Sequence, residues 1–252
     1  MRRRYLLSLL LIGLAFLHPT TLAAQEEQVT LPPLIGQMAI LVGLSLLPFL
    51  VLLLTSFVKM VVVMSLLRSA LGVQQAPPNQ VINGIALILT LYVMFPTGQQ
   101  MWQAVEPLVA KQQETQLISA QSAEFIIEAV QAGREPLRQF LIRNTRAKYM
   151  TGYFRLAYRY FPADVRGSLT PEDFIVVVPA FITSQVEDAF QIGVLIYLPF
   201  FIVDIVTSNI LLAMGMMMLS PMTIALPLKL LLLVMMDGWS LLLQGLVMSF
   251  KT

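Results

Sequence analysis

The sequence has 252 residues, of which 57% are hydrophobic and only 12% are charged, and its formal net charge is +2. Soluble domains usually carry about a quarter charged residues, so this composition is typical of a membrane protein. The chain contains no cysteine and a single histidine, His18. Disulfides, thiolate nucleophiles and the usual zinc sites are therefore excluded, and we expect no enzyme activity, cofactor or metal.

Residues 1–24 have the pattern of a cleavable secretory signal peptide. Three arginines precede an apolar run over residues 5–17, and small residues follow at Ala23 and Ala24. An uncleaved anchor helix is the alternative, although the apolar run is short for one. Cleavage would remove three positive charges, so the basic isoelectric point gives no indication of nucleic-acid binding.

An N-terminal helical hairpin is predicted over residues 25–106. Its first apolar stretch, residues 34–67, is long for one span and contains Pro48. A kinked helix, or two helical pieces that meet near Pro48, explains this length. A Gly and Pro-Pro connector then leads to a second apolar helix over residues 81–105.

The middle region, residues 107–170, is polar and basic, with nine basic against five acidic side chains. Apolar and basic residues alternate at helical spacing, which predicts a helical subdomain with a cationic face. That face is either solvated or a docking surface for a subunit or anionic lipid. A simple four-span topology with an exported N-terminus places this region outside, although positively charged loops favour the cytoplasm.

A C-terminal helical hairpin with a Met-rich loop is predicted over residues 171–252. "LTPEDF" is a helix start, and "SQVE" is a capping box with Ser184 as the cap and Glu187 as its partner. A third long helix then ends near Met214, and a fourth follows over residues 221–250. The fold class is therefore an all-α membrane-type protein with about four long kinked apolar helices.

Few charges lie in the apolar segments: Lys59, Arg68, Asp204, Lys229 and Asp237. An isolated charge in hydrocarbon costs several kcal/mol, so each should have a partner or face a polar interior. From a bend at residues 215–220, Asp204 and Lys229 lie at depths of about 15 and 12 Å. These depths permit an ion pair within one hairpin or between neighbouring copies, and solitary snorkelling to water is the alternative.

Long segments of the chain resemble the FliP/SctR family of the type III secretion export apparatus. They include "TSFVKMVVVMSLLRSALGVQQAPPNQVINGIALILTLYVM", "EPLRQFLIRNT" and the stretch from "PAFITSQVEDAF" to "LLLVMMDGWSLL". Three short markers, "FVK", "LGV" and "SNI", are similar to the injectisome branch, whereas a cleavable leader is more usual in the flagellar branch. The resemblance therefore favours the injectisome and leaves the flagellum open.

The resemblance implies a multi-pass inner-membrane protein that forms a helical homo-oligomer of about five copies. Its partners would be Q/S-type and R/T-type membrane subunits, the larger export gate, the basal-body rings, membrane lipid and secreted polypeptides in transit, with no nucleic acid. Parts would face the periplasm inside the basal body. The family's pore gasket falls on Met216, Met217 and Met218, and its intramembrane acid and base fall on Asp204 and Lys229.

The methionines suit such a gasket because thioether side chains are apolar, unbranched and flexible. Copies that converge on an axis could seal against ions and still yield to varied polypeptide side chains. Gly215 permits the backbone to turn, and Pro221 restarts a helix. Without the resemblance, methionine as a gap filler in a helical hairpin explains the same stretch.

Two functions of other classes compete with export. A small-molecule or proton transporter would use Asp204, Lys229 and Asp237 as a relay. An intramembrane aspartyl protease would pair Asp204 with Asp237. A nearby Lys229 opposes such a dyad, because it would keep one carboxylate ionised.

Overall fold

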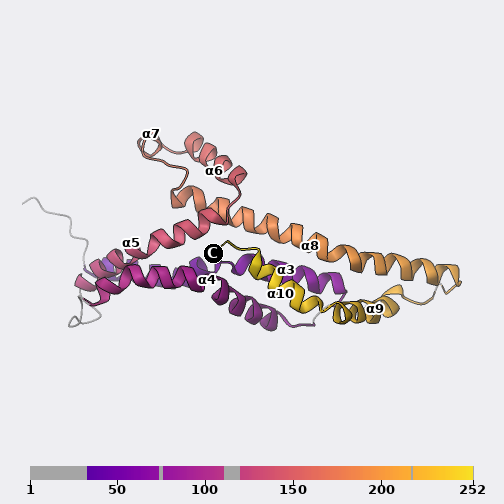
Figure 1. Ribbon diagram of the computed structural model, residues 1–252. Helices are drawn as coiled ribbons and strands as arrows, with labels where there is room; N and C mark the ends of the chain where they lie inside the picture. Colours follow the sequence, from indigo (N-terminus) through magenta and orange to yellow (C-terminus); the bar gives the residue numbers. More distant parts are fainter. Residues whose placement is uncertain (1–32, 74–75, 111–119, 217, 252) are drawn as a thin grey trace, which may run out of the picture. The chain divides into compact units, whose positions relative to one another are not determined.

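The computed structural model describes residues 33–73, 76–110, 120–216 and 218–251 (Figure 1). All regular structure in these ranges is helical, which confirms the all-α prediction. The predicted leader, residues 1–24, lies outside the described residues. The helices are α2 (Pro33–Leu53), α3 (Phe57–Leu71), α4 (Asn79–Ala110), α5 (Ala120–Arg143), α6 (Ala147–Tyr160), α7 (Ala163–Arg166), α8 (Phe174–Ala213), α9 (Pro221–Met235) and α10 (Gly238–Met248).

The chain divides into two compact units, Met1–Gly43 and Leu44–Thr252. The described part of the first unit is the beginning of α2, and all the contacts discussed below lie in the second unit. Two helices, Asn79–Val109 and Phe174–Ala213, are long and apolar enough to cross a membrane. The described residues provide up to four spans if each of two bent helix pairs counts as one.

The packing of α3 against α8 forms the centre of the second unit. Met60, Val63, Met64 and Leu67 recur at helical spacing along α3, and each is at most 1% exposed. On α8, a Cβ atom at Gly193 would overlap the side chain of Leu66. The two helices can approach this closely because Gly193 has no side chain.

The middle region packs on the first half of α8. Helix α5 lies along α4 and contacts α8, and α6 packs on α8. The hydroxyl groups of Tyr153 on α6 and Thr183 on α8 lie 2.9 Å apart. In Figure 1, α6 and the short α7 therefore lie beside the beginning of α8. The second half of α8, from Phe190 to Leu212, carries many exposed large apolar side chains.

Two helix boundaries differ from the predictions. The first apolar stretch is broken at residues 54–56, whereas Pro48 lies inside α2. Ser184 and Glu187 lie inside the continuous helix α8, so the predicted capping box is wrong. The helix begins at Phe174, after a turn in which the backbone N–H of Thr170 donates to a carboxylate oxygen of Asp173 at 2.6 Å.

The predicted fourth helix is also divided. Helices α9 and α10 are bent by 62° relative to each other. Asp237 lies at the bend in a left-handed conformation with φ 49°. Such a conformation is uncommon outside glycine and favours Asn and Asp among the other residues. Beyond the bend α10 packs on α4. Leu246 of α10 joins the buried cluster that contains Met60 of α3 and Phe181 of α8.

Candidate functional site

The Met-rich turn begins with a regular helix C-terminus. Gly215 adopts φ 72°, and its N–H donates to the carbonyl of Leu212 at 3.0 Å. The N–H of Met216 donates to the carbonyl of Leu211 at the same distance. These two bonds form a Schellman motif, in which a left-handed residue, usually glycine, ends the helix. Pro221 then occupies the first turn of α9.

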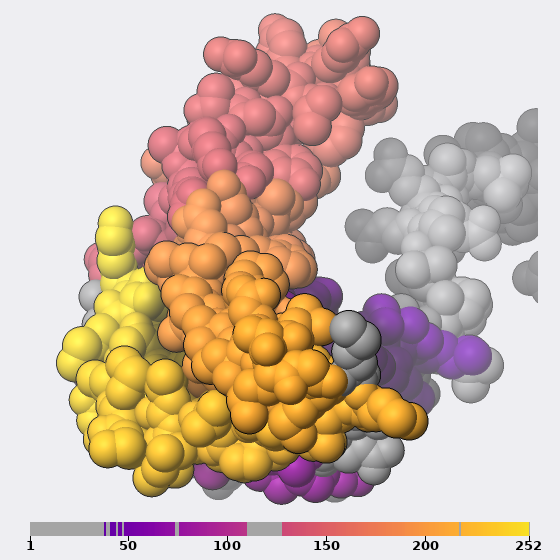
Figure 2. Space-filling view, turned by 90° about the vertical axis from the view of Figure 1, so that its right-hand side faces the viewer, coloured from indigo at the N-terminus to yellow at the C-terminus, as the bar shows by residue number. Residues whose placement is uncertain are grey.

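The turn presents sulfur side chains to the exterior of the single chain. Met214 is 67% exposed, Met216 is 42% exposed and Met218 is fully exposed. Met217 lies outside the described residues. Figure 2 looks onto this end of the second unit, where the orange surface of α8 and the start of α9 faces the viewer. The described methionines of the turn therefore do not fill the core of their own chain.

Asp204 and Lys229 meet across the hairpin of α8 and α9. The Lys229 Nζ lies 2.7 Å from a carboxylate oxygen of Asp204 within one chain. The ammonium also donates to the carbonyl of Ala70 at 3.0 Å, near the C-terminal end of α3. A cation is favourable there because the helix dipole is negative at that end. We call these three residues the hairpin junction, which connects α3, α8 and α9.

A second buried lysine lies at the other end of α3. Lys59 is 2% exposed, and its Nζ lies 3.6 Å from a carboxylate oxygen of Asp188 on α8. The same ammonium donates to the Ser249 hydroxyl at 3.3 Å and lies 4.0 Å from the ring centroid of Phe250. Asp188 also pairs with Arg146 at 2.5 Å. These five residues form what we call the core junction.

The core junction continues onto α6 through charged side chains. Arg146 pairs with Glu187 at 3.3 Å, and its backbone N–H donates to the Ser184 hydroxyl at 3.1 Å. Lys148 donates to Glu187 at 2.6 Å, and this bond raises the pKa of Lys148 above its ordinary value. Part of the predicted cationic face is therefore engaged with α8.

The sequence indicated Lys59 but not its partner, Asp188. Asp188 lies just before the apolar part of α8, where a carboxylate is expected to be solvated. The signal that could have found it is the buried Lys59 itself, which requires a carboxylate near the same depth.

The remaining predicted charges have separate positions. Arg68 donates to the Asn79 side-chain oxygen at 2.5 Å and to the carbonyl of Pro77 at 3.4 Å. It therefore ties the end of α3 to the start of α4. Asp237 is exposed at the bend between α9 and α10. The structure thus gives Asp204 a lysine partner and places Asp237 in a helix break.

Comparison with known proteins gives matches over most of the chain. The FliP family matches residues 40–246. The chain is 44% identical over 225 residues to Yop proteins translocation protein R of Yersinia pestis, which covers 88% of this chain and 99% of that protein. It is 40% identical over 210 residues to Hypersensitivity response secretion protein HrcR of Ralstonia nicotianae. This match covers 83% of this chain and 94% of that protein. It is 40% identical over 252 residues to Flagellar biosynthetic protein FliP of Pectobacterium carotovorum. This match covers 96% of this chain and 92% of that protein.

Proposed function

Because the chain belongs to the FliP family, we propose that it is a pore-forming subunit of the type III protein export gate in the bacterial inner membrane. In this proposal the subunit is structural rather than catalytic and passes unfolded polypeptides. The relatives are named for translocation, secretion and flagellar biosynthesis, which supports a role in export. Relatives that are named for translocation and secretion favour an injectisome over a flagellum.

The observation that carries the pore proposal is the exposure of the methionines at the tip of the α8–α9 hairpin. Met216 and Met218 project from a turn that a Schellman motif and Pro221 fix at both ends. Exposed apolar side chains mark a surface that another chain or lipid covers, and in this proposal a ring of copies covers these methionines. About five such turns around an axis would form a flexible apolar seal.

The proposal includes the assembly that such a ring requires. Copies of this chain would combine with Q/S-type and R/T-type subunits beneath the larger export gate and within the basal-body rings. The protein would cross the inner membrane several times and expose parts to the periplasm. The long exposed apolar stretch of α8, about 36 Å over residues 190–213, is consistent with burial in lipid or against neighbouring subunits.

A permeability measurement tests the seal. Cells that express the assembled complex with Met216, Met217 and Met218 all replaced by alanine should admit small ions, because alanine leaves a gap on the axis. The matched control replaces Met235 and Met248, which are exposed at the ends of α9 and α10, by alanine. An assembled triple variant that is as tight as the control would contradict the seal.

A further inference from the structure

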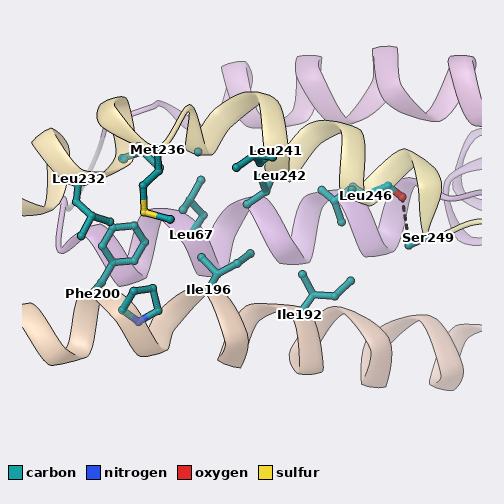
Figure 3. A pocket seen from close by; sticks show the side chains of 14 residues that line it. Leu67, Ile192, Ile196, Phe200, Leu232, Met236, Leu241, Leu242, Leu246 and Ser249 are labelled. Atoms are coloured by element: carbon teal, nitrogen blue, oxygen red, sulfur yellow. Dashed lines mark hydrogen bonds between the residues drawn. The ribbon is translucent and has the colours of Figure 1, made fainter.

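An apolar groove runs between α8 and α10 next to the end of α3. It has a cavity volume of about 480 Å³. Figure 3 shows Ile192, Ile196 and Phe200 of α8 pointing towards Leu242 and Leu246 of α10. Ser249 is the one polar side chain among the described residues that line the groove. A hydrocarbon chain would fit this lining, whereas a polar ligand would lose its hydrogen bonds to water.

One end of the groove is polar. Ser249 lies there, at the opposite end from Leu232 and Met236 in Figure 3. The Lys59 ammonium donates to the Ser249 hydroxyl. On α8, Asp188 precedes Ile192 by one helical turn, so the wall of the groove continues into the core junction. The apolar groove and the charged cluster are therefore parts of one continuous surface.

The charges at this end are strongly unbalanced. The Asn144 side chain accepts a hydrogen bond from the backbone N–H of Lys251 and donates one to its carbonyl, each at 2.9 Å. Arg143 directly precedes Asn144 at the end of α5. Arg143 and Lys251 are exposed, and the described residues provide neither of them with an acidic partner. Lys59, Arg146 and Lys148 pair with the carboxylates of Asp188 and Glu187, and Arg143 and Lys251 add two exposed cations. Five against two leaves an excess of three positive charges.

We propose that this groove binds an acyl chain of an anionic phospholipid, with the phosphate at the cationic end. Charge complementarity selects the anionic headgroup, and the lining selects the chain. The depth also fits, because Phe190, half a turn beyond Asp188, begins the exposed apolar stretch of α8. An apolar helix from another subunit would fill the groove but would not require the cations. The inference rests on the membrane location of the chain and not on the pore.

Gly245 offers a position at which a larger side chain should narrow the groove. It lines the groove, and a Cβ atom there would meet nothing within 4 Å. Gly245→Leu would therefore extend a side chain into the groove, and removing a helical glycine favours folding. Gly84→Leu is the matched control, because Gly84 lies in α4 with equally open space and does not line the groove.

Trp239 provides the reporter. It packs against the cluster that includes Leu67, Phe200 and Leu233, all of which line the groove. The chain has two tryptophans, so Trp102→Phe leaves Trp239 as the sole emitter. The full chain would be reconstituted in phosphatidylcholine vesicles that contain a small fraction of brominated phosphatidylglycerol or brominated phosphatidylcholine, because bromine quenches nearby tryptophan.

We expect brominated phosphatidylglycerol to quench Trp239 more strongly at equal mole fraction. Gly245→Leu should abolish the difference, and Gly84→Leu should preserve it. Arg143→Gln with Lys251→Gln should lower the preference by about fivefold for each charge removed. Equal quenching by the two lipids, or a preference that survives Gly245→Leu, would overturn the proposal. Weak quenching by both lipids would also overturn it and would favour a protein helix in the groove.

Discussion

The hairpin junction and the core junction each place a lysine in an apolar interior, and they differ in how they neutralise its charge. In each, an apolar helix carries a buried lysine that meets a carboxylate of α8. In the hairpin junction, Lys229 has Asp204 at 2.7 Å and the carbonyl of Ala70 at 3.0 Å. In the core junction, Lys59 is 3.6 Å from Asp188, which Arg146 approaches more closely.

This difference shows how a membrane-type chain can distribute its few charges. The hairpin junction is a local pair that closes neighbouring helices, and its carboxylate is 37% exposed. The core junction is a network in which Asp188 serves two cations, while a hydroxyl and an aromatic ring complete the surroundings of Lys59. Loss of one carboxylate should therefore have a larger effect in the core junction.

The largest expected effect follows from Asp188→Ala. This change leaves Lys59 buried without a carboxylate and takes one partner from Arg146, so we expect a loss of about 4 kcal/mol in the free energy of unfolding. Thermal unfolding and folded yield of the detergent-extracted protein would measure it. A loss below about 1 kcal/mol would show that Lys59 does not depend on this carboxylate.

Asp204→Ala should have the next largest effect, about 3 kcal/mol, because it leaves Lys229 with only a carbonyl partner. The double variant with Lys229→Met should recover at least half of this loss. The corresponding double variant of the core junction, Asp188→Ala with Lys59→Met, should recover less because Arg146 remains. A double-mutant cycle on the extracted protein measures the coupling energy of each lysine with its carboxylate. Equal recovery of stability in the two double variants would show that the hairpin junction and the core junction do not differ as pair and network.

Gly193→Ala tests a feature that the junctions share. Both connect α3 with α8, and Gly193 lies between Asp188 and Asp204 on α8, where an added Cβ atom would overlap Leu66 of α3. An added methyl group should push Leu66 away and cost about 1 to 3 kcal/mol. Gly152→Ala is the control, since nothing surrounds that position on α6. Similar thermal stability of the two variants would contradict this close packing.

Gly215→Ala should have a smaller and local effect. Open space surrounds Gly215, so the cost of about 1 to 2 kcal/mol comes from placing alanine at φ 72°. The hairpin junction should be affected more than the core junction, because the turn connects its two helices. Hydrogen exchange would show faster exchange at the end of α8, and a protected helix end would indicate that the Schellman turn is not needed.

The smallest effect is expected for a surface pair, which serves as a reference for the junctions. Glu135 accepts hydrogen bonds from Arg138 at 2.8 and 2.9 Å, and these bonds lower the pKa of Glu135. Its contribution to stability is therefore present above the ordinary glutamate pKa of about 4.3 and is lost as the pH falls through the lowered pKa. Glu135→Gln should flatten only this acidic part of a stability profile. An unchanged profile would show that the pair contributes nothing.

The sequence was sufficient to predict which residues of the C-terminal hairpin lie at similar distances from its turn. The position of Gly215 and the rise of 1.5 Å per residue placed Asp204 and Lys229 at similar depths. The apolar segments and the turn at Pro77 and Pro78 were also visible, because length and composition determine them.

Relations between distant segments could not be predicted in this way. Lys59 and Ser249 are 190 positions apart, and no periodicity connects them. The break at residues 54–56 contains neither glycine nor proline, so tertiary packing rather than local propensity determines it. Ser184 and Glu187 have the spacing of a capping box, but in the structure they contact the α6 region instead.

The central claim is that the Met-rich turn contacts the polypeptide in transit, and site-directed crosslinking tests it most directly. Since the chain has no cysteine, Met218→Cys introduces a unique thiol at a fully exposed position. We expect this thiol to crosslink to an export substrate arrested in the assembled gate, and Met248→Cys, exposed on α10, to remain unlinked. Crosslinks from Met248→Cys together with none from Met218→Cys would contradict the account.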